Sequence, residues 1–131
     1  MFKRLKNCHN IKDFRILAKQ RLPSSLFHYI DGGSDDEITL SRNTESFNKC
    51  DLIPNVLAGM NKVDLSTNLF GQKMKLPFFL SPTAMQRLFH HDGEKAIAKV
   101  AEKEGIMVGV STIGTVSMEE ISRITSTPKI F

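Results

Sequence analysis

The chain has 131 residues, of which 40% are hydrophobic and 24% charged, and this is ordinary usage for one globular domain with a real core. Its formal net charge of +4 is mild and favours a solvated surface over a nucleic-acid-binding face. No apolar run approaches the length of a membrane span.

The N-terminus is basic, with Lys3, Arg4 and Lys6 close together. No secretory signal peptide is visible in residues 1–25, and Cys8 and Cys50 match no metal-ligand spacing. We therefore expect a cytoplasmic protein with two reduced thiols. Peripheral contact of the basic end with the inner face of the membrane stays open as an alternative.

Helical patterns fill residues 10–50. Apolar spacing predicts one helix over 11–21. A second short helix is expected within SSLFHYIDGG, capped by Ser24 or Ser25 and ended by Gly32 and Gly33. A third helix is expected over about 36–48, with Asp35 as its cap and with Ile38 and Phe47 turned inward. Residues 51–76 are predicted to be mostly irregular, with a β-hairpin around the Phe70-Gly71 turn.

From Leu76 onward the pattern changes to alternating strands and helices. Phe78, Phe79 and Leu80 predict a strand covered on both faces, and a second strand is expected over 106–110. The helix between them, over 93–104, has Asp92 as its expected cap, Gly105 as its terminator, and Ala96, Ile97, Val100 and Ala101 on one face. Ser117 and Glu120 form a capping box for another helix, and residues 129–131 look like the start of a third strand.

Strand–helix–strand units of this length are right-handed and parallel. Two such units followed by a third strand fit either an α/β barrel or a doubly wound sheet. Both folds bind their ligands at the carboxyl ends of the strands.

Small and hydroxyl residues follow each of the two predicted strands, and the two turns should lie at the same end of the sheet. Pro82, Thr83 and Ala84 follow the first strand, and residues 111–115 (Ser-Thr-Ile-Gly-Thr) follow the second. Such residues let backbone groups approach a flat ligand, although plain tight turns explain the pattern equally well. Neither turn matches a dinucleotide or nucleoside triphosphate phosphate loop.

Several other side chains could carry chemistry. Tyr29, the only tyrosine, could bind a carboxylate or a hydroxyl, but on its own it is more simply a packing residue. His90 and His91 lack a spaced acidic or cysteine partner, so we interpret them as surface residues and expect no metal site.

Three segments in order, LPSSLFHYIDGGSDDEITLSRN, LPFFLSPTAMQRLFHHDGEKAIAKVAEKEG and VSTIGTVSMEEI, resemble the FMN-dependent α-hydroxy acid dehydrogenases. That family includes the quinone- or cytochrome-linked L-lactate dehydrogenases and the glycolate oxidases, and the HYIDGG version looks closer to the former. The likeness runs from about residue 10 to the last residue. It implies the N-terminal part of a (β/α)8 TIM barrel. Residues 10–50 would then form a helical segment, residues 51–76 an irregular or hairpin segment, and residues 77–131 the first two βα units and the start of the third strand.

The resemblance also implies roles for individual residues. Tyr29 matches the tyrosine that binds the substrate carboxylate. Pro82, Thr83 and Ala84 match the loop whose backbone contacts the flavin ring, and Ser111 matches a serine that hydrogen-bonds the flavin. The implied reaction oxidises an L-2-hydroxy acid, with L-lactate favoured, to the 2-keto acid, using FMN and passing electrons to a quinone, a cytochrome or oxygen. Relatives are often homo-oligomers.

The catalytic base of the family belongs to later strands, so no residue of this chain is assigned to it. We therefore expect a fragment that is inactive alone. Two other readings stay open: a binding or assembly piece that completes its sheet with another chain, and a non-flavin structural domain with the same strand–helix–strand start.

Overall fold

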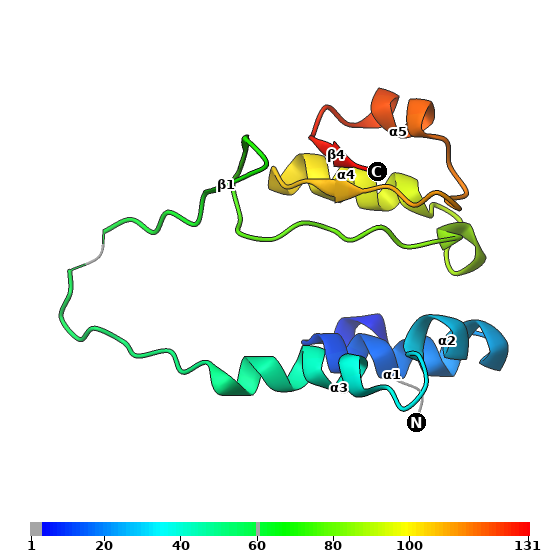
Figure 1. Cartoon of the computed structure of the whole chain (residues 1–131), viewed down its shortest axis with the longest axis horizontal. Helices are drawn as coiled ribbons and strands as arrows, with labels where there is room; N and C mark the ends of the chain where they lie inside the picture. The colour runs from blue at the N-terminus through cyan, green and yellow to red at the C-terminus, as the bar shows by residue number, and fades with distance from the viewer. Residues whose placement is uncertain (1–3, 60) are drawn as a thin grey trace. The chain divides into compact units, whose positions relative to one another are not determined.

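The computed structural model describes residues 4–59 and 61–131. The chain divides into two compact units, Met1–Gly59 and Met60–Phe131, and each is described by itself. Figure 1 follows the chain through both units, with helices in the first and mixed elements in the second.

The N-terminal unit is helical, as its sequence pattern predicts. Helix α1 (Ile11–Arg21) has the predicted bounds, and α3 (Ile38–Glu45) continues into a 3-10 turn at Ser46–Lys49. Helix α2 (Ser24–Asp31) ends as predicted, but neither Ser24 nor Ser25 caps it, because Pro23 holds the N-cap position and Ser24 is already helical. Asn10 caps α1, because its side chain accepts a hydrogen bond from the Asp13 amide at 2.9 Å. A further 3-10 turn, Leu5–Asn7, precedes α1.

Three further details of this unit differ from the prediction. Asp35 does not cap α3, since Glu37 holds the N-cap position in a left-handed conformation with φ 56°. Ile38 and Phe47 do not turn inward, being 62% and 80% exposed. Gly32 ends α2 in extended backbone with φ −83°, so it needs no left-handed conformation there. The inward orientation of Ile38 and Phe47 was predicted from helical spacing, which does not show which side of the helix packs against another segment.

The predicted hairpin is confirmed at the start of the second unit. Strand β1 (Thr67–Leu69) pairs antiparallel with β2 (Gln72–Met74), and Thr67 lies opposite Met74. Both turn residues have positive φ, 50° at Phe70 and 74° at Gly71, as a tight two-residue hairpin turn requires.

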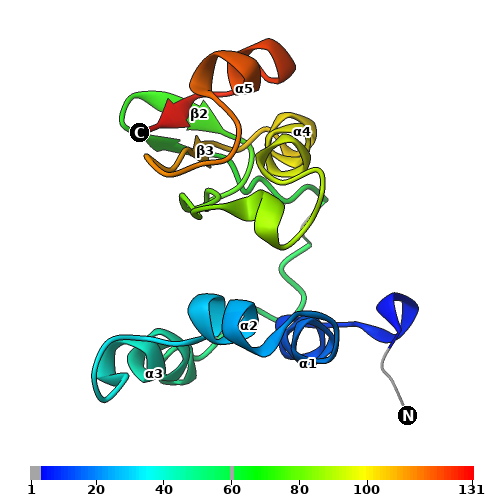
Figure 2. The ribbon, with the colours of Figure 1, turned by 90° about the vertical axis from the view of Figure 1, so that its right-hand side faces the viewer.

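The strand–helix–strand pattern is confirmed in the rest of this unit (Figure 2). Helix α4 (Glu94–Glu104) leads to β3 (Val108–Gly109), and α5 (Met118–Ile124) leads to β4 (Lys129–Ile130). Strands β3 and β4 are parallel, and Leu80 forms a parallel bridge to Val108 on the other side of β3. The three segments therefore lie side by side in chain order, which is the arrangement that successive parallel βα units produce.

The core of this unit lies between α4, α5 and β3. One buried cluster joins Ala98, Val110, Val116 and Ile121, and a second joins Ala101, Ile106 and Val108. Gly105 ends α4 with φ 64°, the left-handed conformation expected of a helix terminator. The Ser117 hydroxyl caps α5 by accepting from the Glu120 amide at 3.2 Å.

Predicted details again fail where they depend on packing. The first strand is reduced to the single bridge at Leu80, and Phe78 is 52% exposed rather than covered on both faces. Val100 is exposed, so the buried face of α4 carries Ala98 and Ala101. Asp92 is not the cap of α4, since Gly93 holds that position. No helix in the described part of the chain is long and apolar enough to cross a membrane.

Candidate site at the carboxyl ends of two parallel strands

Two loops meet at the carboxyl ends of the first two parallel segments. The first loop covers residues 81–93, and the second covers residues 111–116. The Met85 amide donates to the Ile113 carbonyl at 3.1 Å, which joins the two loops directly. The prediction that both turns lie at the same end of the sheet is therefore confirmed.

Gly109 allows the strands beneath these loops to come close together. Its amide donates to the Leu80 carbonyl at 2.7 Å. A Cβ atom at position 109 would lie 2.5 Å from both the Cδ atom and the nitrogen of Pro82. The start of the first loop therefore rests directly on β3, and only glycine leaves room for it.

The first loop presents small groups at an accessible surface. Pro82 and Thr83 are exposed, and Ala84 is partly buried. The Thr83 carbonyl accepts from the Gln86 side-chain amide at 3.2 Å, which braces the loop from within. The segment therefore presents small residues at the surface, as contact with a flat ligand requires.

The second loop is a tight turn built around Ser111. The Ser111 hydroxyl accepts from the Ile113 amide at 3.3 Å, and its carbonyl accepts from the Gly114 amide at 3.0 Å. Ser111 is partly buried, whereas Thr112 and Ile113 are exposed. Its hydroxyl proton is not used in the bond to the Ile113 amide, so it can be donated to a ligand.

The sequence interpretation missed Glu94, which lies where the two loops meet. Its side chain is only 4% exposed, and its carboxylate accepts hydrogen bonds from the Thr115 amide at 2.7 Å and the Thr115 hydroxyl at 2.6 Å. Burial would raise the pKa of Glu94, but hydrogen bonds, chiefly those from Thr115, outweigh it and hold that pKa below its ordinary value. A glutamate at the start of a predicted helix looks like an ordinary exposed residue, so no signal in the sequence pointed to it.

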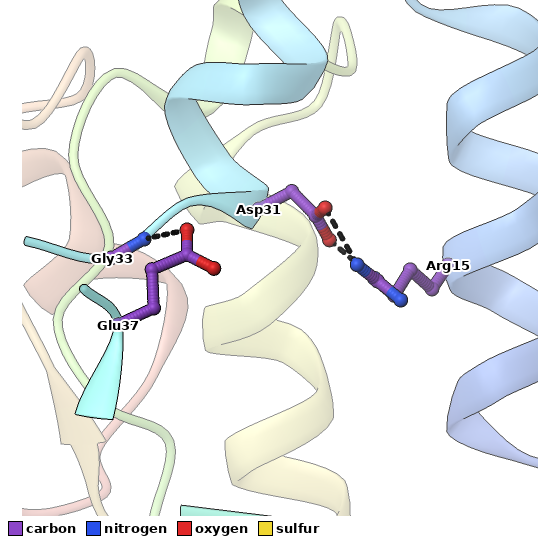
Figure 3. A network of polar contacts seen from close by, with 4 residues as sticks. All are labelled: Arg15, Asp31, Gly33 and Glu37. Carbon is purple, nitrogen blue, oxygen red and sulfur yellow. Dashed lines mark hydrogen bonds and ion pairs between the residues drawn. The ribbon is translucent and has the colours of Figure 1, made fainter. Parts of the chain in front are cut away.

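Tyr29 belongs to the N-terminal unit and is described there alone. It lies on α2 and is 53% exposed, so it is not the packed core residue that spacing alone favoured. The end of the same helix is held by two polar contacts (Figure 3). The Arg15 guanidinium donates to the Asp31 carboxylate at 2.5 and 2.8 Å, and the Gly33 amide donates to Glu37 at 3.0 Å.

His90, His91 and Asp92 form an exposed group on the first loop, with potential ligand atoms within 4.8 Å of one another. The Asp92 carboxylate lies 3.5 Å from the Nε2 atom of His91, and the Asp92 amide donates to the Nδ1 atom of His90 at 3.2 Å. One potential ligand atom is therefore already engaged, and the group lies on the surface, where the sequence interpretation placed the two histidines.

Known proteins resemble this chain over most of its length. Residues 18–131 match the family described as FMN-dependent dehydrogenase. The chain is 41% identical over 119 residues to an L-lactate dehydrogenase of Vibrio parahaemolyticus, covering 91% of this chain and 31% of that protein. It is 36% identical over 113 residues to glycolate oxidase 1 of Zea mays, covering 86% of this chain and 31% of that protein.

Solved structures show the same likeness. A mandelate oxidase superposes with a TM-score of 0.82 at 32% identity, covering 92% of this chain and 36% of that one. A lactate oxidase of Pediococcus acidilactici, described as putative, superposes with a TM-score of 0.83 at 32% identity, covering 94% of this chain and 34% of that one. The chain thus spans about a third of the length of the relatives that it matches.

Proposed function

The chain belongs to the FMN-dependent dehydrogenase family, and on that premise we propose that it supplies the first flavin-facing loops of an L-2-hydroxy acid oxidoreductase built on a (β/α)8 barrel. The family's cofactor is FMN. One observation carries the proposal: two loops that each begin with small residues, inside the matched region, are joined at the carboxyl ends of adjacent parallel strands. Ligands of parallel α/β folds bind at that edge.

The described residues fit a flavin ring. Pro82, Thr83 and Ala84 place small residues along one edge, and Ser111 has a hydroxyl proton to donate. Gly109 lets Pro82 pack directly against β3, and this contact fixes where the first loop starts relative to the strand. Bound FMN would accept the two electrons taken from the hydroxy acid.

Tyr29 is the proposed contact for the substrate carboxylate. Its phenol is about half exposed on α2, so it can reach a ligand outside its own helix. A phenol O–H donates to a carboxylate oxygen, and a charge-assisted bond of this kind fixes the orientation of a small acid.

L-lactate is the proposed substrate, because the lactate dehydrogenases of Vibrio species are 41% and 44% identical to this chain, against 35–36% for the plant glycolate oxidases. The proposed electron acceptor is a quinone, a cytochrome or oxygen. A homo-oligomer in the cytoplasm, with peripheral membrane contact as an alternative, completes the proposal.

We assign no catalytic base among the described residues. His28, His90 and His91 do not match the family's histidine, so we expect the 131 residues alone to bind FMN weakly and to leave L-lactate unoxidised.

Complementation tests the proposal. The full chain is co-expressed with the part of the Vibrio parahaemolyticus enzyme that it does not match, about two-thirds of that protein, and the purified complex is examined for FMN absorbance and for dye reduction by L-lactate, glycolate and mandelate. We expect a yellow complex that reacts fastest with L-lactate. Tyr29→Phe should raise KM for L-lactate about tenfold, since it removes one hydrogen bond to a charged group.

The outcomes separate the readings. A stable complex that holds no FMN would favour the assembly piece, whose specific support is that β4 pairs on one side only within the described residues. A folded complex that binds FMN but is equally active with Tyr29→Phe would remove Tyr29 from the substrate site.

A further inference from the structure

Helix α4 carries a carboxylate near each end, and each is held by a different loop. Glu94, its first residue, is bound by Thr115 of the loop that follows β3. Glu102, near its last residue, accepts hydrogen bonds from the Thr125 hydroxyl and from the Ser126 amide, the latter at 2.7 Å. The two contacts are alike in chemistry, but Glu94 serves the edge with the proposed flavin loops, whereas Glu102 serves the segment that enters β4.

Thr115 connects Glu94 to both loops. Its hydroxyl donates to the Oε2 atom of Glu94 at 2.6 Å and accepts from the Arg87 amide of the first loop at 3.2 Å. Its own amide donates to the Oε1 atom of Glu94 at 2.7 Å. One threonine and one carboxylate therefore add to the Met85–Ile113 bond in fixing the second loop to the first loop and to the start of α4.

The surroundings favour this exact placement of the carboxylate. Gly93, just before it, has φ 49° and ψ −132°, a conformation that side chains rarely adopt, and this turn brings Glu94 inward. At Gly114 a Cβ atom would lie 3.4 Å from the Oε1 atom of Glu94 and 3.1 Å from the Ser111 carbonyl. A carboxylate this buried is costly unless its lone pairs are filled, and Thr115 provides two donors.

We infer that Glu94 is a positioning residue, whose carboxylate acts through Thr115 to hold the Ser111 loop at a fixed distance from Pro82, Thr83 and Ala84. The inference that this distance serves a flavin rests on the proposed function. The coupling between the loops does not, since it is a property of the chain itself.

Hydrogen exchange of single amides in the full chain tests the coupling without any ligand. Thr115→Val keeps the shape of the side chain but removes the hydroxyl that joins Glu94 to Arg87. We expect the Met85 and Arg87 amides to exchange about tenfold faster, because a hydrogen bond to a charged group is worth roughly that factor. Glu94→Ala should accelerate the same amides and that of Thr115.

Thr125→Val is the matched control, because it removes the equivalent hydroxyl bound to Glu102. It should accelerate the Thr127 amide, which also donates to Thr125, and leave the Met85 amide unchanged. The Val110 amide, which donates to Ile130 in the sheet, reports general loss of structure. The inference is overturned if Met85 and Arg87 are unaffected by Thr115→Val and Glu94→Ala, or if Val110 accelerates as much as they do.

FMN affinity of the complemented complex then tests the flavin link separately. We expect Thr115→Val to weaken FMN binding about tenfold relative to Thr125→Val. A wild-type complex that binds no FMN refutes the proposed function and leaves the exchange result standing. Equal FMN affinities of the two variants would refute the role of Glu94 in the flavin site.

Discussion

At the scale of single residues, hydrogen-bond donors rather than cations hold two glutamate side chains of helix α4. Glu94 is held by Thr115, and Glu102 by Thr125 and Ser126. Hydrogen bonds from Thr125 and Ser126 lower the pKa of Glu102, as Thr115 does for Glu94. Cations act elsewhere: a hydrogen bond from Arg15 lowers the pKa of Asp31, and one from Lys95 lowers that of Glu120.

The lowered pKa of Glu94 predicts acid sensitivity. The folded state holds this carboxylate below its ordinary pKa of 4.5, so the unfolded chain binds more protons between the two pKa values. The free energy of unfolding therefore decreases as the pH is lowered. The contribution of Glu94 is complete above about pH 4.5 and is lost as pH falls through the folded pKa.

Thr115→Val should therefore cost about 1 kcal/mol at pH 7 and less near pH 3. Urea unfolding of the two proteins at both pH values measures the difference. Thr112→Val, which alters an exposed hydroxyl of the same loop, is the control and should show no such pH dependence. A cost for Thr115→Val that does not change with pH would contradict the coupling to the Glu94 carboxylate.

At the scale of elements, close approach of the first two strands positions the candidate site. Within the described residues, the first strand segment bridges to β3 at Leu80 alone, yet the Gly109 amide and the Pro82 ring bring the backbone of the first loop against β3. The short strands alone would place the two loops loosely. The position of the two loops therefore depends more on the close packing at Gly109 than on the number of hydrogen bonds between the first two strands.

Gly109→Ala should destabilise the C-terminal unit by about 1–3 kcal/mol, since the new Cβ would meet the Pro82 backbone nitrogen and the strands must move apart. Urea unfolding followed by circular dichroism measures this loss. Gly71→Asn is the control, because nothing lies within 4 Å of a Cβ there and asparagine tolerates the positive φ of the hairpin turn. Equal stability of Gly109→Ala and wild type would contradict the close packing of Pro82 on β3.

At the scale of the whole molecule, the two units differ in how much core they contain. The described residues of the N-terminal unit bury two large apolar side chains, Leu17 and Phe27. The C-terminal unit buries clusters around α4, α5 and β3, including Ile121 at 2% exposure. Because buried apolar area is the main source of stability, we expect the C-terminal unit to be the more stable part.

Limited trypsin digestion should first cleave near Lys62, in the exposed segment without helix or strand that precedes β1, and leave a resistant fragment of about residues 63–131. Ile121→Ala should cost about 2–5 kcal/mol and make that fragment sensitive. Mass spectrometry of the products identifies the first cleavage site and the resistant fragment. Digestion of the C-terminal fragment as fast as the N-terminal helices would contradict the expected order of stability.

The sequence was sufficient for what depends on neighbouring residues. The bounds of α1, the end of α2, the hairpin at Phe70-Gly71, the end of α4 at Gly105 and the Ser117 cap all follow from apolar spacing and from the local preferences of glycine and serine. The position of the two turns at one edge followed from the order of elements, because parallel strands joined by helices admit one connection geometry. Family membership followed from the ordered motifs.

Only the tertiary structure decided which side chains face which neighbour. Phe78 is exposed, Val100 turns away from the core, and Glu94 is buried under Thr115, although helical or strand spacing alone allows the opposite in each case. The contact between Glu94 and Thr115 joins residues 21 positions apart, and local propensity carries no information about such a contact. The sequence thus determined where the site loops lie in the chain, whereas packing decided that Thr115 and one buried carboxylate hold them together.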